Sequence, residues 1–205
     1  MPSVRFKVLS RRVSELRENL LPREFSAIGL YSNRVYERAR GFRVLAHAEF
    51  ESYVEDRAIE VVNDAHVIWG KSGDIRPCLL ALMAHREAKM NIPDAISDLT
   101  DRVQKFPTLH ARIEFEKRQY THYVKKQNHG IKERNLLRLL LPLGVTKDEF
   151  DSTWLTATES WASSRGEIAH TSAKVQVQIN PRSELDTVRE ILKGFKRIDG
   201  ILNSK

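Results

Sequence analysis

The stretch SNRVYERARGFRVLAHAEFESYVEDRAIEVVNDAHVIW, residues 32–69, decides the fold of this chain. Its apolar residues recur with a period near 3.6, which predicts one long helix, whole or broken. At 1.5 Å per residue such a helix is about 57 Å long, enough to form the spine of a domain. The apolar stripe of the expected helix consists of Val35, Ala39, Phe42, Leu45, Ala46 and Tyr53.

One acidic residue, Glu49, interrupts this apolar stripe. The helical projection places it in the middle of the stripe, where a carboxylate costs free energy unless it is paired. Two interpretations follow. Either Glu49 orients functional groups of a neighbouring helix, or it makes a structural ion pair with one of the many arginines.

The rest of the chain repeats the helical period, and no alternation of apolar and polar residues is long enough to predict a strand. We therefore expect an all-α fold, an antiparallel helical bundle formed by one domain over residues 1–205. Residues 71–107 hold glycine and prolines around one short helical piece, so we expect an insertion there. The other expected helices span residues 4–20, 109–128 and 133–141, begin at 146, and begin near 183.

Capping signals mark the last two of these helices. Residues 146–149, TKDE, have the form of a capping box, which predicts a helix that begins at Thr146. A similar Ser-x-x-Asp signal at Ser183 predicts the start of the last helix. The inner face of the Thr146 helix is expected to hold Phe150, Trp154, Ala157 and Trp161. Because the two tryptophans share that face, core packing is favoured over stacking on nucleic-acid bases.

The composition points to polyanions as partners. The chain has a formal net charge of +7 and a pI near 9.6. Such a surplus of cations raises the affinity for nucleic acid through counterion release, although it also serves solubility alone.

The sequence also indicates the compartment. Cys78 is the single cysteine, which excludes an intramolecular disulfide and a cysteine-rich zinc site and is typical of a reducing compartment. The charged first residues do not form a signal peptide, and no segment has the roughly 18 apolar residues that a membrane span requires. We therefore expect a cytoplasmic protein with no membrane partner.

After the aromatic face of the Thr146 helix the sequence changes character, to RGEIAH at residues 165–170. Arg165 and His170 are five positions apart, which is 140° around an ideal helix, so they do not share a face. Either His170 is simply exposed, or the helix bends at the small residues that precede it.

The spacing of Arg165 and His170 is not sufficient evidence by itself. With 21 arginines and 7 histidines in 205 residues, about 0.7 such pairs are expected by chance. Arg40 and His47 satisfy a looser spacing inside the long helix. The context separates the two pairs, because residues 165–170 follow a capped aromatic helix, where side chains can face a groove.

Three blocks of the sequence resemble the HEPN superfamily of helical domains, and more closely its RiboL-PSP-HEPN branch. They are RGFRVLAHAEFESYVE at residues 40–55, the apolar segment 136–145, and RGEIAH at 165–170 with the closing helix to Leu202. The resemblance extends over about two-thirds of the chain and leaves residues 71–128 poorly matched. Many motifs of this superfamily have a polar residue directly after the arginine, where this chain has Gly166.

The resemblance implies an RNA-cleaving protein with Arg165 and His170 as its catalytic pair. It further implies a homodimer in which both motifs face one cleft, and a toxin or phage-defence role under an antitoxin or regulatory protein. Glu49 and Glu167 are the candidate supporting residues.

The chemistry fits these residue types without a metal or other cofactor. A histidine that titrates near neutral pH can take the proton of the RNA 2′-hydroxyl or protonate the leaving 5′-oxygen. An arginine can bind the phosphate oxygens as negative charge develops. The remaining histidines have no metal-ligand spacing, and the chain has no phosphate-binding glycine loop.

Two alternatives to a ribonuclease stay open. One is a non-catalytic helical module of the same superfamily that binds nucleic acid, a nucleotide or a protein partner. The other is a structural bundle in which the spacing of Arg165 and His170 is accidental.

Overall fold

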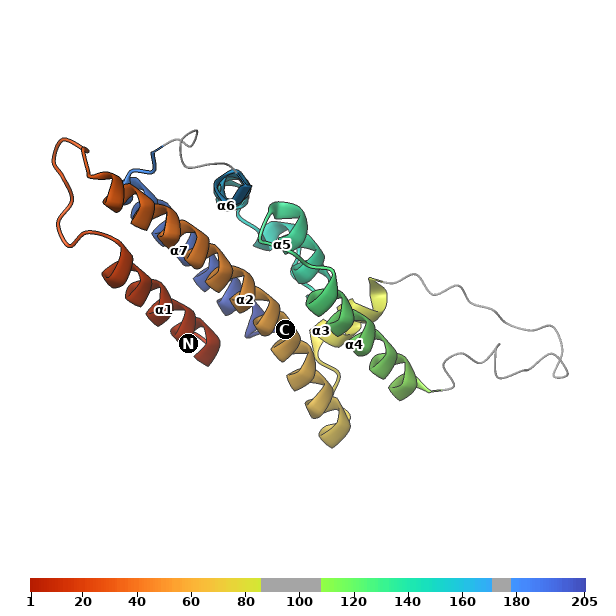
Figure 1. Cartoon of the computed structure of the whole chain (residues 1–205). Coiled ribbons are helices and arrows are strands. Elements are labelled where there is room, and N and C mark those ends of the chain that lie inside the picture. The colour runs from red at the N-terminus through yellow and green to blue at the C-terminus, as the bar shows by residue number, and fades with distance from the viewer. Residues whose placement is uncertain (86–107, 171–177) are drawn as a thin grey trace, which may run out of the picture.

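A computed structural model describes residues 1–85, 108–170 and 178–205, and for residues 165–170 it describes the backbone alone. Every regular element in these ranges is helical, which confirms the all-α prediction (Figure 1). The α-helices are α1 (Val4–Leu20), α2 (Asn33–Ser72), α3 (Pro77–Ala84), α4 (Leu109–Lys126), α5 (Glu133–Leu140), α6 (Ser152–His170) and α7 (Pro181–Leu202). Two 3₁₀ turns, η2 (Leu141–Leu143) and η3 (Lys147–Glu149), lie between α5 and α6.

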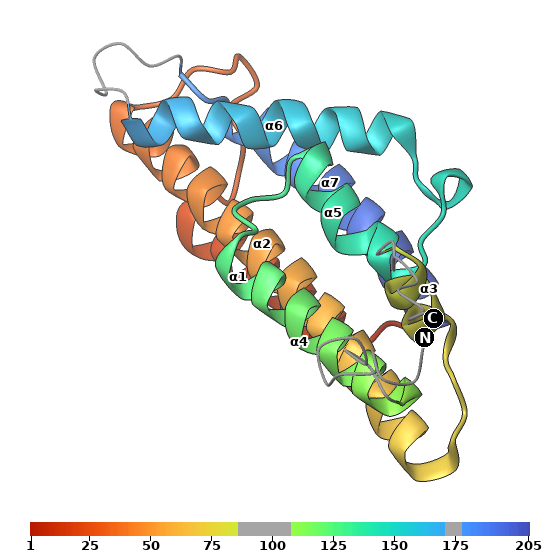
Figure 2. The ribbon, with the colours of Figure 1, turned by 90° about the vertical axis from the view of Figure 1, so that its right-hand side faces the viewer.

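The long helix α2 is the spine of the fold, as the sequence predicts. It has 40 residues and contacts each of the other α-helices. Helix α1 runs antiparallel to it and α7 runs parallel to it (Figure 2), while α6 packs against both α2 and α7. Because α2 has neighbours on several sides, its buried residues do not form one stripe, and Leu45, expected inside, is 46% exposed.

The core is aromatic where α2, α6 and α7 meet. Phe195 of α7 stacks on Phe50 of α2 with ring centroids 5.1 Å apart, and it meets the edge of Trp154 at 5.2 Å. Trp154 also donates from Nε1 to the carbonyl oxygen of Ile191, 3.1 Å away. A Cβ added at Gly194 would lie 2.0 Å from that Nε1, so this glycine gives the indole its space. Core packing of the tryptophans is therefore confirmed.

Both predicted helix starts near the C-terminus need correction. The Thr146 capping box forms, but it caps only η3, because Phe150 is extended at φ −82° and ψ 142°. Helix α6 begins after Asp151, whose Oδ1 accepts from the Trp154 N–H at 3.1 Å. Ala157, which was expected on the inner face of this helix, is exposed. The last helix is capped by Asn180 ahead of Pro181, three residues before the predicted cap.

The region expected to be an insertion contributes to the core in its described part. Helix α3 buries Cys78, Leu79 and Leu82 within the main hydrophobic cluster. The backbone N–H of Cys78 also donates to the carbonyl oxygen of Lys205 at 3.3 Å, which ties α3 to the C-terminus. The rest of that region, residues 86–107, lies outside the described residues. None of the helices in the described ranges is long and apolar enough to cross a membrane.

The two ends of the chain meet at Asp199, a fully buried carboxylate of α7. It accepts hydrogen bonds from the backbone N–H and Oγ of Ser3, at 2.7 and 2.6 Å, and from the Tyr53 hydroxyl at 3.0 Å. Arg57 compensates its charge from 3.3 Å. Burial and the nearby Asp199 raise the pKa of Tyr53 far above its ordinary value, so its hydroxyl stays a donor. We assign this cluster to the stability of the fold.

Candidate active site at the end of α6

The RGEIAH motif forms the last turns of α6, which continues without a break to His170. A continuous helix leaves positions 165 and 170 about 140° apart, so the bend considered above is not found. The side chains of Arg165, Glu167 and His170 lie outside the described residues. The described part of the site is the turn that precedes them, together with the helices that contact this turn.

That turn is anchored by Trp161, which is buried. Its indole stacks on the ring of His47 at a centroid distance of 5.8 Å and meets the edge of Phe50 at 5.9 Å. Its Nε1 donates to Glu184 Oε1 at 2.7 Å. Three residues later, Ser164 Oγ donates to the Trp161 carbonyl oxygen at 2.8 Å. The last described side chains of α6 are thus fixed against α2 and α7.

Glu184 of α7 accepts hydrogen bonds from both α2 and α6 at this end of the bundle. Its side chain is 1% exposed, and its two oxygens accept from Arg43 Nε at 2.9 and 3.0 Å and also from Arg43 Nη2. Arg43 Nη1 donates to Ser164 Oγ at 2.9 Å. We call Arg43, Trp161, Ser164 and Glu184 the Glu184 cluster. It joins α2, α6 and α7 at the residue that precedes Arg165.

The Glu184 cluster is balanced in charge and in hydrogen bonds. A buried carboxylate is costly unless a cation and further donors compensate it, and here Arg43 and the Trp161 indole do so. Glu184 also lies in the first turn of α7, where a negative charge is favoured by the helix dipole.

The competing Arg40 and His47 pair lies inside the protein. Arg40 is 7% exposed and pairs with Glu37, while His47 is 2% exposed under the Trp161 ring. A phosphodiester in solution cannot reach a histidine buried in this way. Arg40 and His47 are therefore not accessible as a catalytic pair, in line with the preference for residues 165–170 in the sequence analysis.

Glu49, the predicted supporting residue, faces α1. Its Oε1 lies 3.3 Å from Arg12 Nε, and its side chain is 30% exposed. Hydrogen bonds and charge from Glu15 and Glu49 raise the pKa of Arg12. This is the structural ion pair that the sequence left open as an alternative, and a role for Glu49 in the motif stays a prediction. The side chain of Glu167, the other candidate supporting residue, lies outside the described residues.

Sequence reasoning missed Arg43 and Glu184, which are the charged residues beside the described end of α6. They stand 141 positions apart, so no local spacing joins them. The signal available was weak: Arg43 falls within the block at residues 40–55, and Glu184 is an acid next to a predicted helix start.

Two exposed arginines lie at this end of the bundle. The loop between α1 and α2 lies next to the start of α7, since a Cβ at Gly29 would be 3.5 Å from Asn180 Nδ2 (Figures 1 and 2). Arg34 is the second residue of α2 and Arg182 is the second residue of α7. Both are exposed, and neither pairs with a carboxylate among the described residues. Such arginines are available to phosphates.

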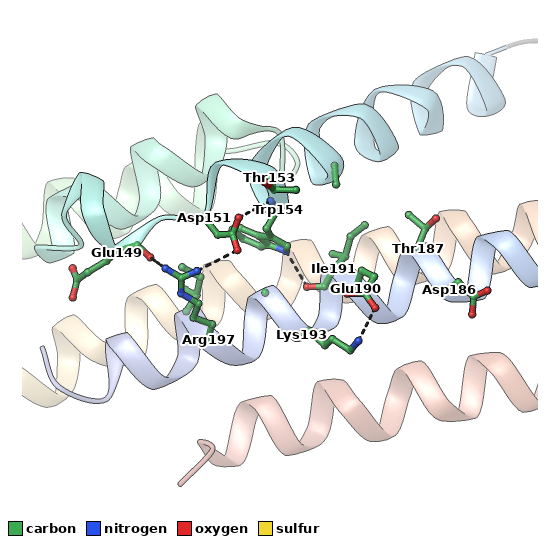
Figure 3. Close-up of a pocket in the computed structure, with 13 residues that line it drawn as sticks. Glu149, Asp151, Thr153, Trp154, Asp186, Thr187, Glu190, Ile191, Lys193 and Arg197 are labelled. Carbon is green, nitrogen blue, oxygen red and sulfur yellow. Dashed lines mark hydrogen bonds and ion pairs between the residues drawn. The ribbon is translucent and has the colours of Figure 1, made fainter.

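A cavity lies elsewhere, along the first half of α6. It has a volume of about 660 Å³ and lies between α6 and α7, with Asp151 and Arg197 paired at 3.2 Å on its wall (Figure 3). Its α6 lining ends at Ala157, two turns before the motif. Among the described side chains, no three histidine, cysteine or acidic groups are arranged to hold a metal ion.

The sequence model of the RiboL-PSP-HEPN family matches residues 7–204, nearly the whole chain. No curated protein and no solved structure matches the chain.

Proposed function

The chain belongs to the RiboL-PSP-HEPN family, and from this premise we propose that it is an endoribonuclease that cleaves RNA through the 2′-hydroxyl without a metal. One observation carries the proposal. Arg165 and His170, the residue pair suited to this chemistry, follow directly on an anchored turn of α6 within the matched region. Arg34 and Arg182, two exposed arginines at the same end, support an RNA substrate.

In the proposed reaction, the imidazole of His170 takes the proton of a 2′-hydroxyl. The freed oxygen attacks the adjacent phosphorus, and the bond from phosphorus to the 5′-oxygen breaks. The leaving oxygen takes a proton from a protonated histidine, and the products are a 2′,3′-cyclic phosphate and a 5′-hydroxyl. Arg165 donates hydrogen bonds to the phosphate oxygens as negative charge develops there.

Two chains supply the groups that this reaction needs. One histidine must act as base while another group acts as acid, and positions 165 and 170 diverge by 140° on one continuous helix. A homodimer that brings two motifs to one cleft provides both histidines. The aromatic face of α6 does not support this assembly, because Trp154 and Trp161 are buried within the chain.

We expect light scattering at micromolar concentration to give twice the 23.7 kDa mass of one chain. The dimer should persist in the Arg165→Ala and His170→Ala variants, since neither substitution removes the anchored turn. A single 23.7 kDa species for the wild-type protein would contradict the paired site.

RNA cleavage is expected to be insensitive to chelators, because neither an arginine nor a histidine requires a metal in this role. Purified protein should digest a mixed RNA substrate at the same rate in EDTA and in Mg²⁺. A magnesium-dependent nuclease in parallel reactions controls for complete chelation. Activity that appears only with added Mg²⁺ would rule out the proposed mechanism.

The biological role that follows is a toxin or a phage-defence component. The family is the basis for this role, and an antitoxin or another regulatory protein would restrain the nuclease in its own cell. Expression of the wild-type chain should therefore arrest growth, and substitution of His170 should relieve the arrest.

A further inference from the structure

We propose that Arg43 and Glu184 are positioning residues, which hold the catalytic turn of α6 through the hydroxyl of Ser164. The inference rests on the proposed ribonuclease function and adds three residues to it. None of the three is assigned a contact with RNA. Their effect is on the direction in which α6 presents Arg165, the residue that follows Ser164 in the chain.

The planar guanidinium of Arg43 contacts two partners at once. Arg43 places Nε and Nη2 on the Glu184 carboxylate and Nη1 on Ser164 Oγ, 2.9 Å away. Because the guanidinium is planar and its donors have fixed directions, the carboxylate on one side defines where the hydroxyl lies on the other. A lysine at this position would keep the charge but could not span both partners.

The carboxylate of Glu184 is held rigidly by its donors. Glu184 is 1% exposed and receives a third donor, the Trp161 indole N–H, at 2.7 Å. All of these contacts come from buried or half-buried groups on three helices, so the carboxylate is a fixed reference for α2, α6 and α7 together. Ser164 is thereby located relative to the whole bundle.

Ser164 is a serine within helix α6, where alanine would be the better helix former. Alanine has the higher helix propensity, and serine competes with helical hydrogen bonding by bonding to nearby backbone groups. Ser164 does bond to the Trp161 carbonyl oxygen at 2.8 Å, while accepting from Arg43. The hydroxyl therefore links the backbone of the preceding turn to Arg43, a link that alanine cannot make.

The test compares Ser164→Ala with Ser164→Thr in steady-state RNA cleavage by the full-length protein. Misplacement of a reacting group by about 1 Å can cost about 10²-fold, so we expect Ser164→Ala to lower kcat by about 10- to 100-fold. KM and the melting temperature should stay at their wild-type values. Ser164→Thr keeps the hydroxyl and should restore most of kcat.

Arg43→Lys provides the second variant. It should lower kcat to a similar degree, and adding Ser164→Ala to it should lower kcat little further, because both substitutions break the same link. Ser160→Ala, an exposed serine on the same helix, is the matched control and should cleave at the wild-type rate.

The outcomes separate this inference from the proposed function. A wild-type protein that does not cleave RNA would overturn both. If the wild type cleaves, a wild-type kcat in Ser164→Ala overturns the positioning role and leaves the ribonuclease standing. A higher KM with unchanged kcat, or a loss of activity that follows a lower melting temperature, also overturns it.

Discussion

Arg165→Ala and His170→Ala are each expected to reduce RNA cleavage below detection while the protein keeps the fold and the oligomeric state of the wild type. General acid–base catalysis contributes about 10²–10⁴-fold, and one donor that stabilises developing charge contributes about 10²–10³-fold. Both positions follow Trp161, the last buried aromatic residue of α6. Their truncation should therefore change the free energy of unfolding by no more than about 1 kcal/mol. Initial rates and circular dichroism measure the two effects separately.

The matched control for these variants is Arg118→Ala combined with His122→Ala. These residues form an exposed arginine and histidine pair on α4, four positions apart and away from the motif. The Arg40 and His47 pair is unsuitable, because both side chains are buried and their removal would destabilise the core. Full activity in both motif variants, or an equal loss in the α4 control, would contradict the assignment.

The helical period of the sequence was sufficient to predict most of the fold. Helix α1 spans Val4–Leu20 as expected, and α2 extends only three residues beyond the expected end at Trp69. Helix starts were less predictable where two capping signals follow one another. Thr146 and Asp151 both cap backbone N–H groups. Because Phe150 between them is extended, α6 begins after Asp151 and not at Thr146.

The candidate site was predictable only in part, for a physical reason. A motif within one helix is visible in the sequence, so residues 165–170 could be singled out. A helical projection, however, gives the angle of a side chain and not the helix that covers it. Glu49 and Arg43 both lie on α2, and only the packing shows that Glu49 meets α1 while Arg43 meets the end of α6.

The central claim is that the RNA 2′-hydroxyl is the nucleophile, and a substrate with one 2′-deoxy nucleotide tests it most directly. The cleavage site in a defined RNA is mapped first, and the nucleotide on the 5′ side of that bond is then replaced by its 2′-deoxy form. We predict that cleavage of this bond falls below detection, while other cleaved bonds react as before and end in 2′,3′-cyclic phosphates. Undiminished cleavage at the substituted bond, with a free 3′-hydroxyl on the product, would contradict the account.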